Sequence, residues 1–178
     1  MSRRVTPFLL AALLAAPLSG CSLLKKEKSL PPPPNTDTTP DTGGIGTPIT
    51  IRGSRTELEV RVTRLLDPAP VGAGDQTLDP GARFVGIELD LRNIGNGTYA
   101  ESPGEDSKLL LAGGSAADGV NLLGGPCGGR FPLHVTLHPG ARAAGCVPFE
   151  VPRPGRPQRF QFALDSGFGS EVGTWNLR

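Results

Sequence analysis

Apolar and polar side chains alternate with a period of two along four stretches of the chain. Because successive side chains of a β-strand point to opposite faces, this alternation is typical of a strand with one buried face. Four shorter apolar stretches follow the same pattern, and no segment sustains the 3.6-residue period of an amphipathic helix. The longer stretches are Leu58–Val62, Val85–Leu91, Val147–Val151 and Phe160–Leu164; the shorter are Ile49–Ile51, Lys108–Leu111, Leu133–Leu137 and Thr174–Leu177.

Turn-forming residues separate these stretches, in agreement with the 25 glycines and 19 prolines of the 178-residue chain. Seven or eight short strands in about 130 residues predict an all-β fold, an antiparallel β-sandwich. We expect Phe149 and Trp175 to be core aromatics of this sandwich. The turn signals are Asp67-Pro68, Asp79-Pro80-Gly81, Asn96-Gly97, Pro103-Gly104, Pro139-Gly140 and Pro154-Gly155.

One six-residue pattern occurs twice, as Leu78–Arg83 and Leu137–Arg142, and each copy directly precedes a predicted strand. An internal duplication would produce this repeat. We favour the simpler interpretation that one Pro-Gly turn is used twice.

The start of the chain combines two basic residues, Arg3-Arg4, with the apolar run Val5–Leu18. This run is shorter than the roughly 20 apolar residues that a membrane-spanning helix needs. It ends with Leu18-Ser19-Gly20 directly before Cys21, which resembles the lipobox of bacterial lipoprotein signal peptides.

The lipobox resemblance implies that signal peptidase removes residues 1–20 after recognising Leu18, Ser19 and Gly20. It also implies that Cys21 carries a diacylglyceryl group and becomes the acylated N-terminus. Because each buried CH₂ contributes about 0.8 kcal/mol, two or more acyl chains hold a protein stably on a membrane. A plain secretory signal, or a structural helix in which Cys21 is incidental, is the alternative.

Residues 21–46 contain three lysines, the run Pro31–Pro34 and a segment rich in Asn, Thr, Asp and Gly. They lack an apolar period and cannot bury a hydrophobic face. We therefore predict a disordered tether over 21–46, followed by a single domain over 47–178.

If Cys21 is acylated, Cys127 and Cys146 remain as a pair in an oxidising, exported setting. A disulfide between them would contribute roughly 3 kcal/mol by closing the loop. Two free thiols or a metal pair are the alternatives, although the chain has no CxxC motif and its histidines lack zinc-site spacing. We expect the disulfide and no metal site.

The order of turns and strands is similar to that of a known group of domains. Pro80-Gly81 leads into Phe84–Asn93, and Pro139-Gly140 leads through Gly145 into Phe149–Pro152. This order resembles an Ig-like (telokin-like) domain of unknown function in exported bacterial proteins, especially actinobacterial ones. Members of that group are similar in fold to secreted mycobacterial immunogenic antigens.

The resemblance covers residues 47–178 and implies an Ig-like β-sandwich. It implies no common activity and no catalytic residues. The chain departs from the group's pattern in its glycine-rich stretch Gly113–Gly129, where the number of strands stays open, and in its pair of cysteines.

Gly95–Ala100 matches the G-x-G-x-x-A form of a dinucleotide-binding loop after a strand. Such a loop requires a following helix, whose N-terminus receives the pyrophosphate. Pro103-Gly104 follows almost at once, so we interpret the segment as a hairpin loop with Asn96-Gly97 at its turn.

The candidate catalytic and metal-binding residues do not form a recognisable set. Two residues four apart on a strand, such as His134 and His138, lie roughly 13 Å apart and cannot bind one metal together. Ser115 lacks the strand and helix that flank a nucleophile elbow, although a triad with His134 stays open.

Three acidic residues, Glu101, Glu105 and Asp106, fall in one predicted loop. They could bind Ca²⁺ weakly, but their spacing is not that of an EF-hand. We interpret them as solvated carboxylates.

Charge excludes another class of function. The whole chain has a net charge of +1, and beyond residue 46 its 13 basic residues are interleaved with 14 acids. No basic stripe or aromatic platform remains for a nucleic acid, and we expect no nucleic-acid partner.

The sequence therefore predicts a lipid-anchored Ig-like domain on the outer face of the cell membrane. We expect it to be a binding or interaction module of the cell envelope, attached through Cys21, with an envelope protein or wall ligand as partner. We expect no enzymatic activity and no cofactor. A passive structural lipoprotein is the alternative, and a hydrolytic enzyme ranks last.

Overall fold

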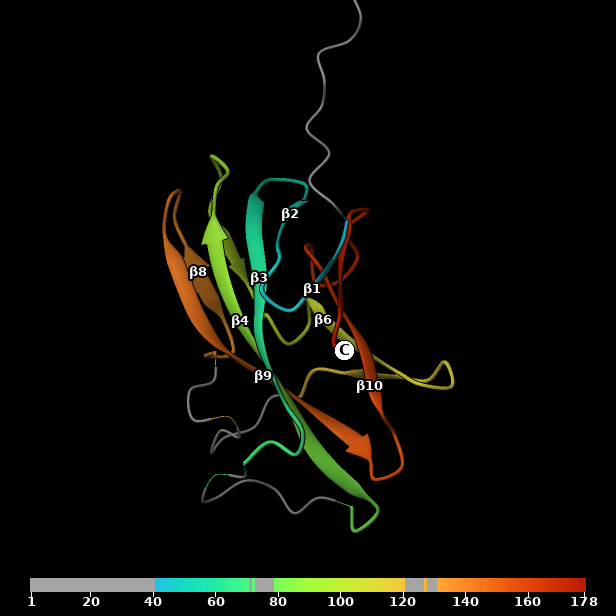
Figure 1. Cartoon of the computed structure of the whole chain (residues 1–178). Coiled ribbons are helices and arrows are strands. Elements are labelled where there is room, and N and C mark those ends of the chain that lie inside the picture. Colours follow the sequence, from blue (N-terminus) through green and yellow to red (C-terminus); the bar gives the residue numbers. More distant parts are fainter. Residues whose placement is uncertain (1–40, 71, 73–78, 121–126, 128–130) are drawn as a thin grey trace, which may run out of the picture. The chain divides into compact units, whose positions relative to one another are not determined.

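The computed structural model describes residues 41–70, 72, 79–120, 127 and 131–178, all within the unit Asp37–Arg178 (Figure 1). The predicted signal peptide, 1–20, and most of the predicted tether, 21–46, lie outside the described residues. In the described part of the chain, no helix is long and apolar enough to cross a membrane.

The first sheet has four antiparallel strands in the order β2-β3-β4-β9. In Figure 1 they lie side by side in one layer. The apolar members of the predicted alternation are buried, from Ile49 at 1% exposure to Phe149 at 0%. The strands are β2 (Pro48–Arg52), β3 (Glu57–Leu66), β4 (Ala82–Asn93) and β9 (Arg142–Pro152).

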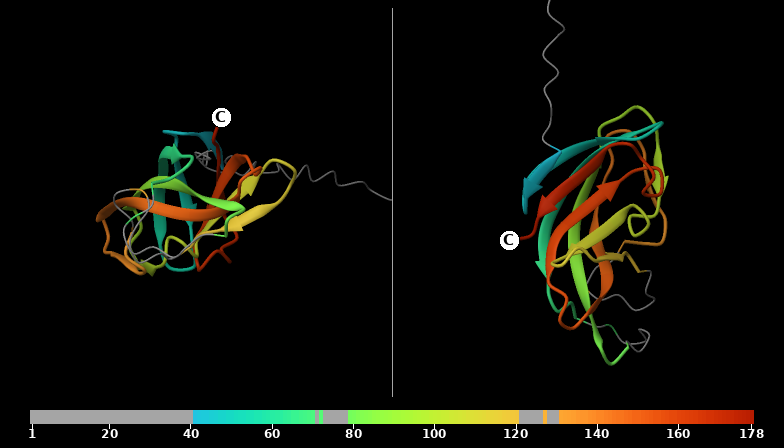
Figure 2. Two further views of the ribbon diagram at one scale, coloured as in Figure 1. Left: turned by 90° about the horizontal axis from the view of Figure 1, so that it is seen from below. Right: turned by 90° about the vertical axis from the view of Figure 1, so that its right-hand side faces the viewer.

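The second sheet has five strands in the order β1-β11-β10-β6-β7, and the right-hand view of Figure 2 faces it. A third sheet pairs β5 with β8. Strand β1 runs parallel to β11, and the other pairs are antiparallel. The strands are β1 (Thr42–Gly44), β5 (Tyr99–Glu101), β6 (Ser107–Leu111), β7 (Ala116–Asp118), β8 (Val135–Leu137), β10 (Pro157–Ala163) and β11 (Val172–Asn176).

Aromatic rings from both large sheets meet in the core. Phe149 of β9 packs edge-on against Phe160 of β10, with ring centroids 6.2 Å apart. Phe160 also lies 5.7 Å from Trp175 of β11, and all three side chains are fully buried. The two sheets therefore enclose one apolar core, and the predicted all-β sandwich is confirmed.

Three strands were not predicted: β1, β5 and β7. Each has three residues, too few to show alternation. Strand β1 lies inside the segment assigned to the tether, so the folded sheet begins at Thr42 instead of residue 47. Strand β7 lies inside the glycine-rich stretch 113–129, where the strand count had stayed open.

The hairpin interpretation of Gly95–Ala100 is wrong. Strand β4 ends at Asn93, and the following strand, β5, pairs with β8 and not with β4. The loop packs against the β2–β3 connection instead. The backbone at Gly97 lies so close to this connection that a Cβ atom there would collide with the carbonyl oxygen of Arg55.

The repeated Pro-Gly sequence forms two related turns. The amide of Ala82 donates to the carbonyl of Asp79 at 2.8 Å, and the amide of Ala141 donates to that of His138 at 2.9 Å. Gly140 has a left-handed φ of 81°, whereas the φ of Gly81 is not positive. The two copies of the Pro-Gly pattern thus form turns of different types before β4 and β9.

Candidate functional site

The two remaining cysteines are joined: Cys127 and Cys146 form a disulfide. They belong to what we call the disulfide cluster, which also contains Ala69 and Phe84. Strand alternation places Phe84 and Cys146 on the face of the first sheet opposite the main core. Cys21 and its preceding residues Leu18, Ser19 and Gly20 lie outside the described residues.

Gly86 of β4 makes room for this disulfide. A Cβ atom at Gly86 would collide with the sulfur of Cys127 and lie 2.9 Å from that of Cys146. The sequence carried a signal for this contact: Gly86 stands at an outward position of an otherwise regular strand. A glycine inside a strand often marks the close approach of another group.

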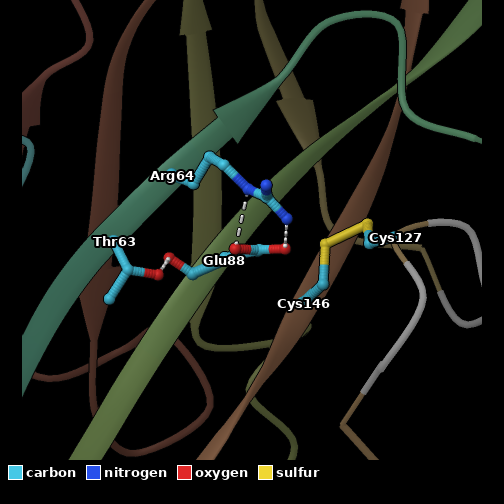
Figure 3. The surroundings of a disulfide bond; sticks show 5 residues. All are labelled: Thr63, Arg64, Glu88, Cys127 and Cys146. Atoms are coloured by element: carbon cyan, nitrogen blue, oxygen red, sulfur yellow. Dashed lines mark hydrogen bonds and ion pairs between the residues drawn. A yellow bond between two sulfur atoms is a disulfide. The ribbon is translucent and has the colours of Figure 1, made fainter.

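An ion pair lies next to the disulfide, as Figure 3 shows. The Nε and Nη2 atoms of Arg64 donate to the two carboxylate oxygens of Glu88, at 3.0 and 2.6 Å. These hydrogen bonds raise the pKa of Arg64. Because the guanidinium is exposed, the pair adds little to stability.

The residues considered for catalysis are not brought together. Ser115 lies in the turn between β6 and β7, and His134 precedes β8 in another sheet. Among the described residues, no hydrogen bond joins the side chains of Ser115 and His134. The other histidine, His138, has its Nδ1 atom 3.3 Å from the hydroxyl oxygen of Thr98. No group of three potential metal ligands occurs within the described ranges.

The acidic segment differs from the expected solvated loop, and that interpretation is wrong for Asp106. This side chain is only 3% exposed. Its Oδ2 accepts a hydrogen bond from the hydroxyl of Tyr99 at 2.6 Å, while its buried Oδ1 receives no donor among the described residues. Glu101 lies at the end of β5 and not in the loop.

Burial raises the pKa of Asp106 to about 8, because the ionised carboxylate loses its water. The hydrogen bond from Tyr99 opposes this shift, whereas nearby Glu101 and Glu105 add to it. Burial and the adjacent Asp106 also raise the pKa of Tyr99. The Asp106 carboxyl is therefore mostly protonated at neutral pH.

Glu101 and Ser54 hold the connection between β10 and β11, which we call the Phe168 turn (Leu164–Glu171). The amide of Ser166 donates to Oε2 of Glu101 at 2.9 Å. The amide and hydroxyl of Ser54 donate to the carboxylate of Asp165 at 3.0 and 2.8 Å. Two segments distant in sequence, the loop at Ser54 and the end of β5, thus hold this turn.

The backbone of the Phe168 turn adopts a costly conformation. Asp165 and Ser166 have left-handed φ angles of 58° and 55°, and Gly167 follows with 78°. For a residue with a Cβ atom this region costs on the order of 1 kcal/mol. The hydrogen bonds to Ser54 and Glu101 offset that cost, and such conformations often occur at functional sites.

The turn presents Phe168 to solvent. This side chain is 90% exposed, the largest value among the exposed large apolar residues of the described chain. It borders an open cavity of about 320 Å³, whose lining includes Asp106, Lys108, Gln161 and Val172. The volume lies at the lower end of the range for small-ligand sites.

Comparisons with known structures show the fold. The chain is similar to MPT63, a secreted protein from Mycobacterium tuberculosis, with a TM-score of 0.57, 17% identity, and coverage of 76% of this chain and 95% of that one. It is similar to the yjhA protein from Bacillus subtilis, with a TM-score of 0.52, 15% identity, and coverage of 76% and 99%.

A third similar structure is ycdA, a candidate lipoprotein from Bacillus subtilis, with a TM-score of 0.50 and 11% identity over 71% of this chain and 37% of that one. No protein-family model and no curated protein matches the sequence. At these identities the likeness establishes the β-sandwich fold. It transfers no site residue to this chain.

Sequence reasoning did not single out Phe168 as part of a site. The available signal was an aromatic residue between two glycines, Gly167 and Gly169, in the connection between two strands. Such an aromatic has no place in the inward alternation and is free to face solvent.

Proposed function

We propose that the chain is a lipid-anchored, extracytoplasmic Ig-like domain and a binding module of the cell envelope, with the Phe168 turn as its contact surface. It performs no catalysis, uses no cofactor and binds no nucleic acid. The proposal rests mainly on one observation: Phe168 is 90% exposed on a turn held in a left-handed backbone conformation.

An exposed aromatic on a well-held turn suits binding better than a passive spacer role. Single apolar side chains on a surface are common, but the backbone that carries Phe168 is held by hydrogen bonds of Asp165 with Ser54 and of Ser166 with Glu101. An aromatic side chain has only two χ angles and loses little conformational entropy on binding, and aromatic residues are enriched at interfaces. The neighbouring cavity offers space for a partner group.

The proposed location has separate support. The lipobox resemblance at Leu18–Cys21 supports export and acylation. The disulfide suits an oxidising compartment, and MPT63, which shares the fold, is a secreted protein.

The Cys21→Ala variant tests the anchor. We expect this variant to leave the membrane fraction and the detergent phase of a phase-separation assay, because it lacks the acylated thiol. A Cys21→Ala protein that still partitions into detergent would contradict lipid anchoring.

Retention on cell-envelope fragments from the source bacterium tests binding, with the whole protein in detergent micelles. We expect saturable retention that weakens about tenfold in Phe168→Ala, the scale of a moderate interface residue. Leu133→Ala is the matched control, since Leu133 is 57% exposed and lies outside the Phe168 turn. Retention that is absent, or equal in both variants, favours the passive structural alternative.

A further inference from the structure

The outward face of the second sheet carries three polar side chains in a line across neighbouring strands. The register of this sheet places Gln161 of β10 opposite Lys108 of β6, and Lys108 opposite Asp118 of β7. Residues directly opposite each other in an antiparallel pair project from the same face. Leu109 and Phe160, next to them along the strands, are buried in the core, so these three side chains face outward. We call Gln161, Lys108 and Asp118 the polar row.

The polar row and the Phe168 turn line the same cavity. All three residues of the row belong to the lining of the open cavity of about 320 Å³, together with Ser166, Gly167 and Phe168 of the turn. The side chain of Phe168 is 90% exposed, so its ring is free to contact a molecule in the cavity. An aromatic ring thus stands beside a line of hydrogen-bonding groups.

The polar row offers a ligand both hydrogen-bond donors and acceptors. Lys108 has three N–H donors, and its Nζ lies 3.6 Å from a carboxylate oxygen of Asp118. These two side chains are 54% and 84% exposed, so water and not protein occupies most of their capacity. The amide of Gln161 has two donors and an acceptor, of which Thr174 uses one donor at 3.4 Å. A ligand whose groups both donate and accept, such as a polyol, matches this mixture.

The charges of the cavity favour a ligand without net charge. Within the polar row, the ammonium group of Lys108 lies beside the carboxylate of Asp118. The carboxyl groups of Glu105 and Asp106 belong to residues of the same lining, which disfavours an anion. Lys108 stands in the middle of the row and disfavours a cation. A neutral ligand avoids both repulsions.

We propose that this cavity is a carbohydrate site, which binds a neutral glycan with a sugar ring against Phe168 and its hydroxyl groups on the polar row. A sugar ring has a face of C–H groups that packs on the negative face of an aromatic ring. Its hydroxyl groups both donate and accept hydrogen bonds. A volume of about 320 Å³ suits one unit of a longer chain better than a whole protein element. The assignment rests on the proposed binding function and names its ligand class.

Equilibrium dialysis tests the assignment directly, with the whole protein in micelles of a detergent that has no sugar headgroup. The probes are radiolabelled neutral tetrasaccharides of glucose, mannose, galactose and N-acetylglucosamine, and empty micelles are the blank. We expect saturable binding of at least one probe, with a Kd on the order of 1 mM or tighter, because an open site with few contacts binds weakly. Tetralysine and tetraglutamate should not displace it. Failure of all the sugars to bind, or displacement by either charged peptide, would overturn the proposal.

Variants locate the bound sugar and separate ring stacking from general apolar contact. Phe168→Tyr retains a flat ring and should bind within about twofold of the wild type, whereas Phe168→Leu lacks the ring and should bind about tenfold more weakly. Gln161→Ala should weaken binding about fivefold through lost hydrogen bonds. Arg159→Ala, at an exposed position of β10 outside the cavity lining, is the matched control and should bind as the wild type does.

Urea midpoints close to that of the wild type check that each variant is folded. Unchanged affinity in either Phe168→Leu or Gln161→Ala would contradict the site, because the sugar would then bind elsewhere on the protein.

Retention on cell-envelope fragments distinguishes failure of this assignment from failure of the proposed function. We expect the tetrasaccharide that binds to release the protein from the fragments, and protease treatment of the fragments to leave retention intact. If protease abolishes retention and no sugar competes, the partner is a protein, so the binding function stands and the carbohydrate site fails. If a sugar binds in dialysis and the fragments retain nothing, the carbohydrate site stands and the envelope-binding function fails.

Discussion

The disulfide cluster and the Phe168 turn both join segments that are distant in sequence, but they do so by different physical means. The disulfide cluster joins Cys127 to Cys146 covalently among apolar side chains. The Phe168 turn is held by hydrogen bonds from Ser54 and Glu101, with the buried Asp106 behind it. One region is therefore insensitive to moderate changes of pH, and the other contains a titrating group.

This difference separates the scaffold from the surface that we propose for binding. The main core holds the two large sheets together, and the disulfide joins Cys127 to β9, in both cases by contacts that do not titrate. The turn depends on a few exchangeable contacts, which is the usual situation of segments that move or bind. The following predictions test this contrast, from the largest expected effect to the smallest.

Among changes in the two regions compared, the largest effect should come from the disulfide. We expect Cys127→Ser/Cys146→Ser to lower the free energy of unfolding by about 3 kcal/mol, because the unfolded chain gains the freedom of the open loop. Urea denaturation of the wild type and the variant measures the difference. Chymotrypsin cleavage at Phe168 serves as the control and should be unchanged at pH 7. Equal urea midpoints would show that the bond does not support the scaffold.

Gly86→Ala should cost about 2 kcal/mol, since the added methyl group meets both sulfur atoms and the strand cannot yield without disturbing its neighbours. A double-mutant cycle sharpens this prediction. In a Cys127→Ala/Cys146→Ala background the sulfur atoms are gone, and the cost of Gly86→Ala should fall below about 1 kcal/mol. An equal cost in both backgrounds would separate Gly86 from the disulfide.

The stability contribution of Asp106 should depend on pH. Its folded-state pKa of about 8 lies above the ordinary value of 3.8, so the folded state binds the extra proton between these limits. The contribution is complete below about pH 3.8 and is lost as the pH rises to about 8, at up to about 1.4 kcal/mol per pH unit. Thermal unfolding from pH 6 to 8 should therefore show Asp106→Asn gaining stability relative to the wild type. Parallel curves would contradict the protonated carboxyl.

The smallest effect should come from Phe168. Its side chain is exposed, so Phe168→Ala should change the free energy of unfolding by no more than about 0.5 kcal/mol. Phe160→Ala, a change in the core, is the contrasting control and should cost about 4 kcal/mol. A large destabilisation by Phe168→Ala would mean that the side chain packs against the domain and is not a presented contact.

The strands of the sandwich were predictable because burial on one face imposes alternation. Leu58, Val60 and Val62 are fully buried, as their spacing predicts. The three-residue strands were not predictable, because β1 forms only when Thr42–Gly44 can add to the edge of β11. That pairing depends on backbone groups, which every sequence carries alike.

The candidate site was less predictable than the fold. The pairing of Cys127 with Cys146 was expected from the cysteine count. The burial of Asp106 was not, because a carboxylate in an acidic loop is usually solvated. In the folded chain this side chain is buried, and its Oδ2 accepts a hydrogen bond from Tyr99 of β5.

The amino-acid sequence by itself determined the class of fold, the position of the long strands and a lipobox-like start. These are properties of local pattern, and local pattern is written directly in the chain. Tertiary structure alone decided that Gly86 accommodates a disulfide, that Asp106 is buried and that Phe168 is presented on a strained turn. Each of these depends on segments that meet only after folding, since burial and the shift of a pKa are set by neighbours in space.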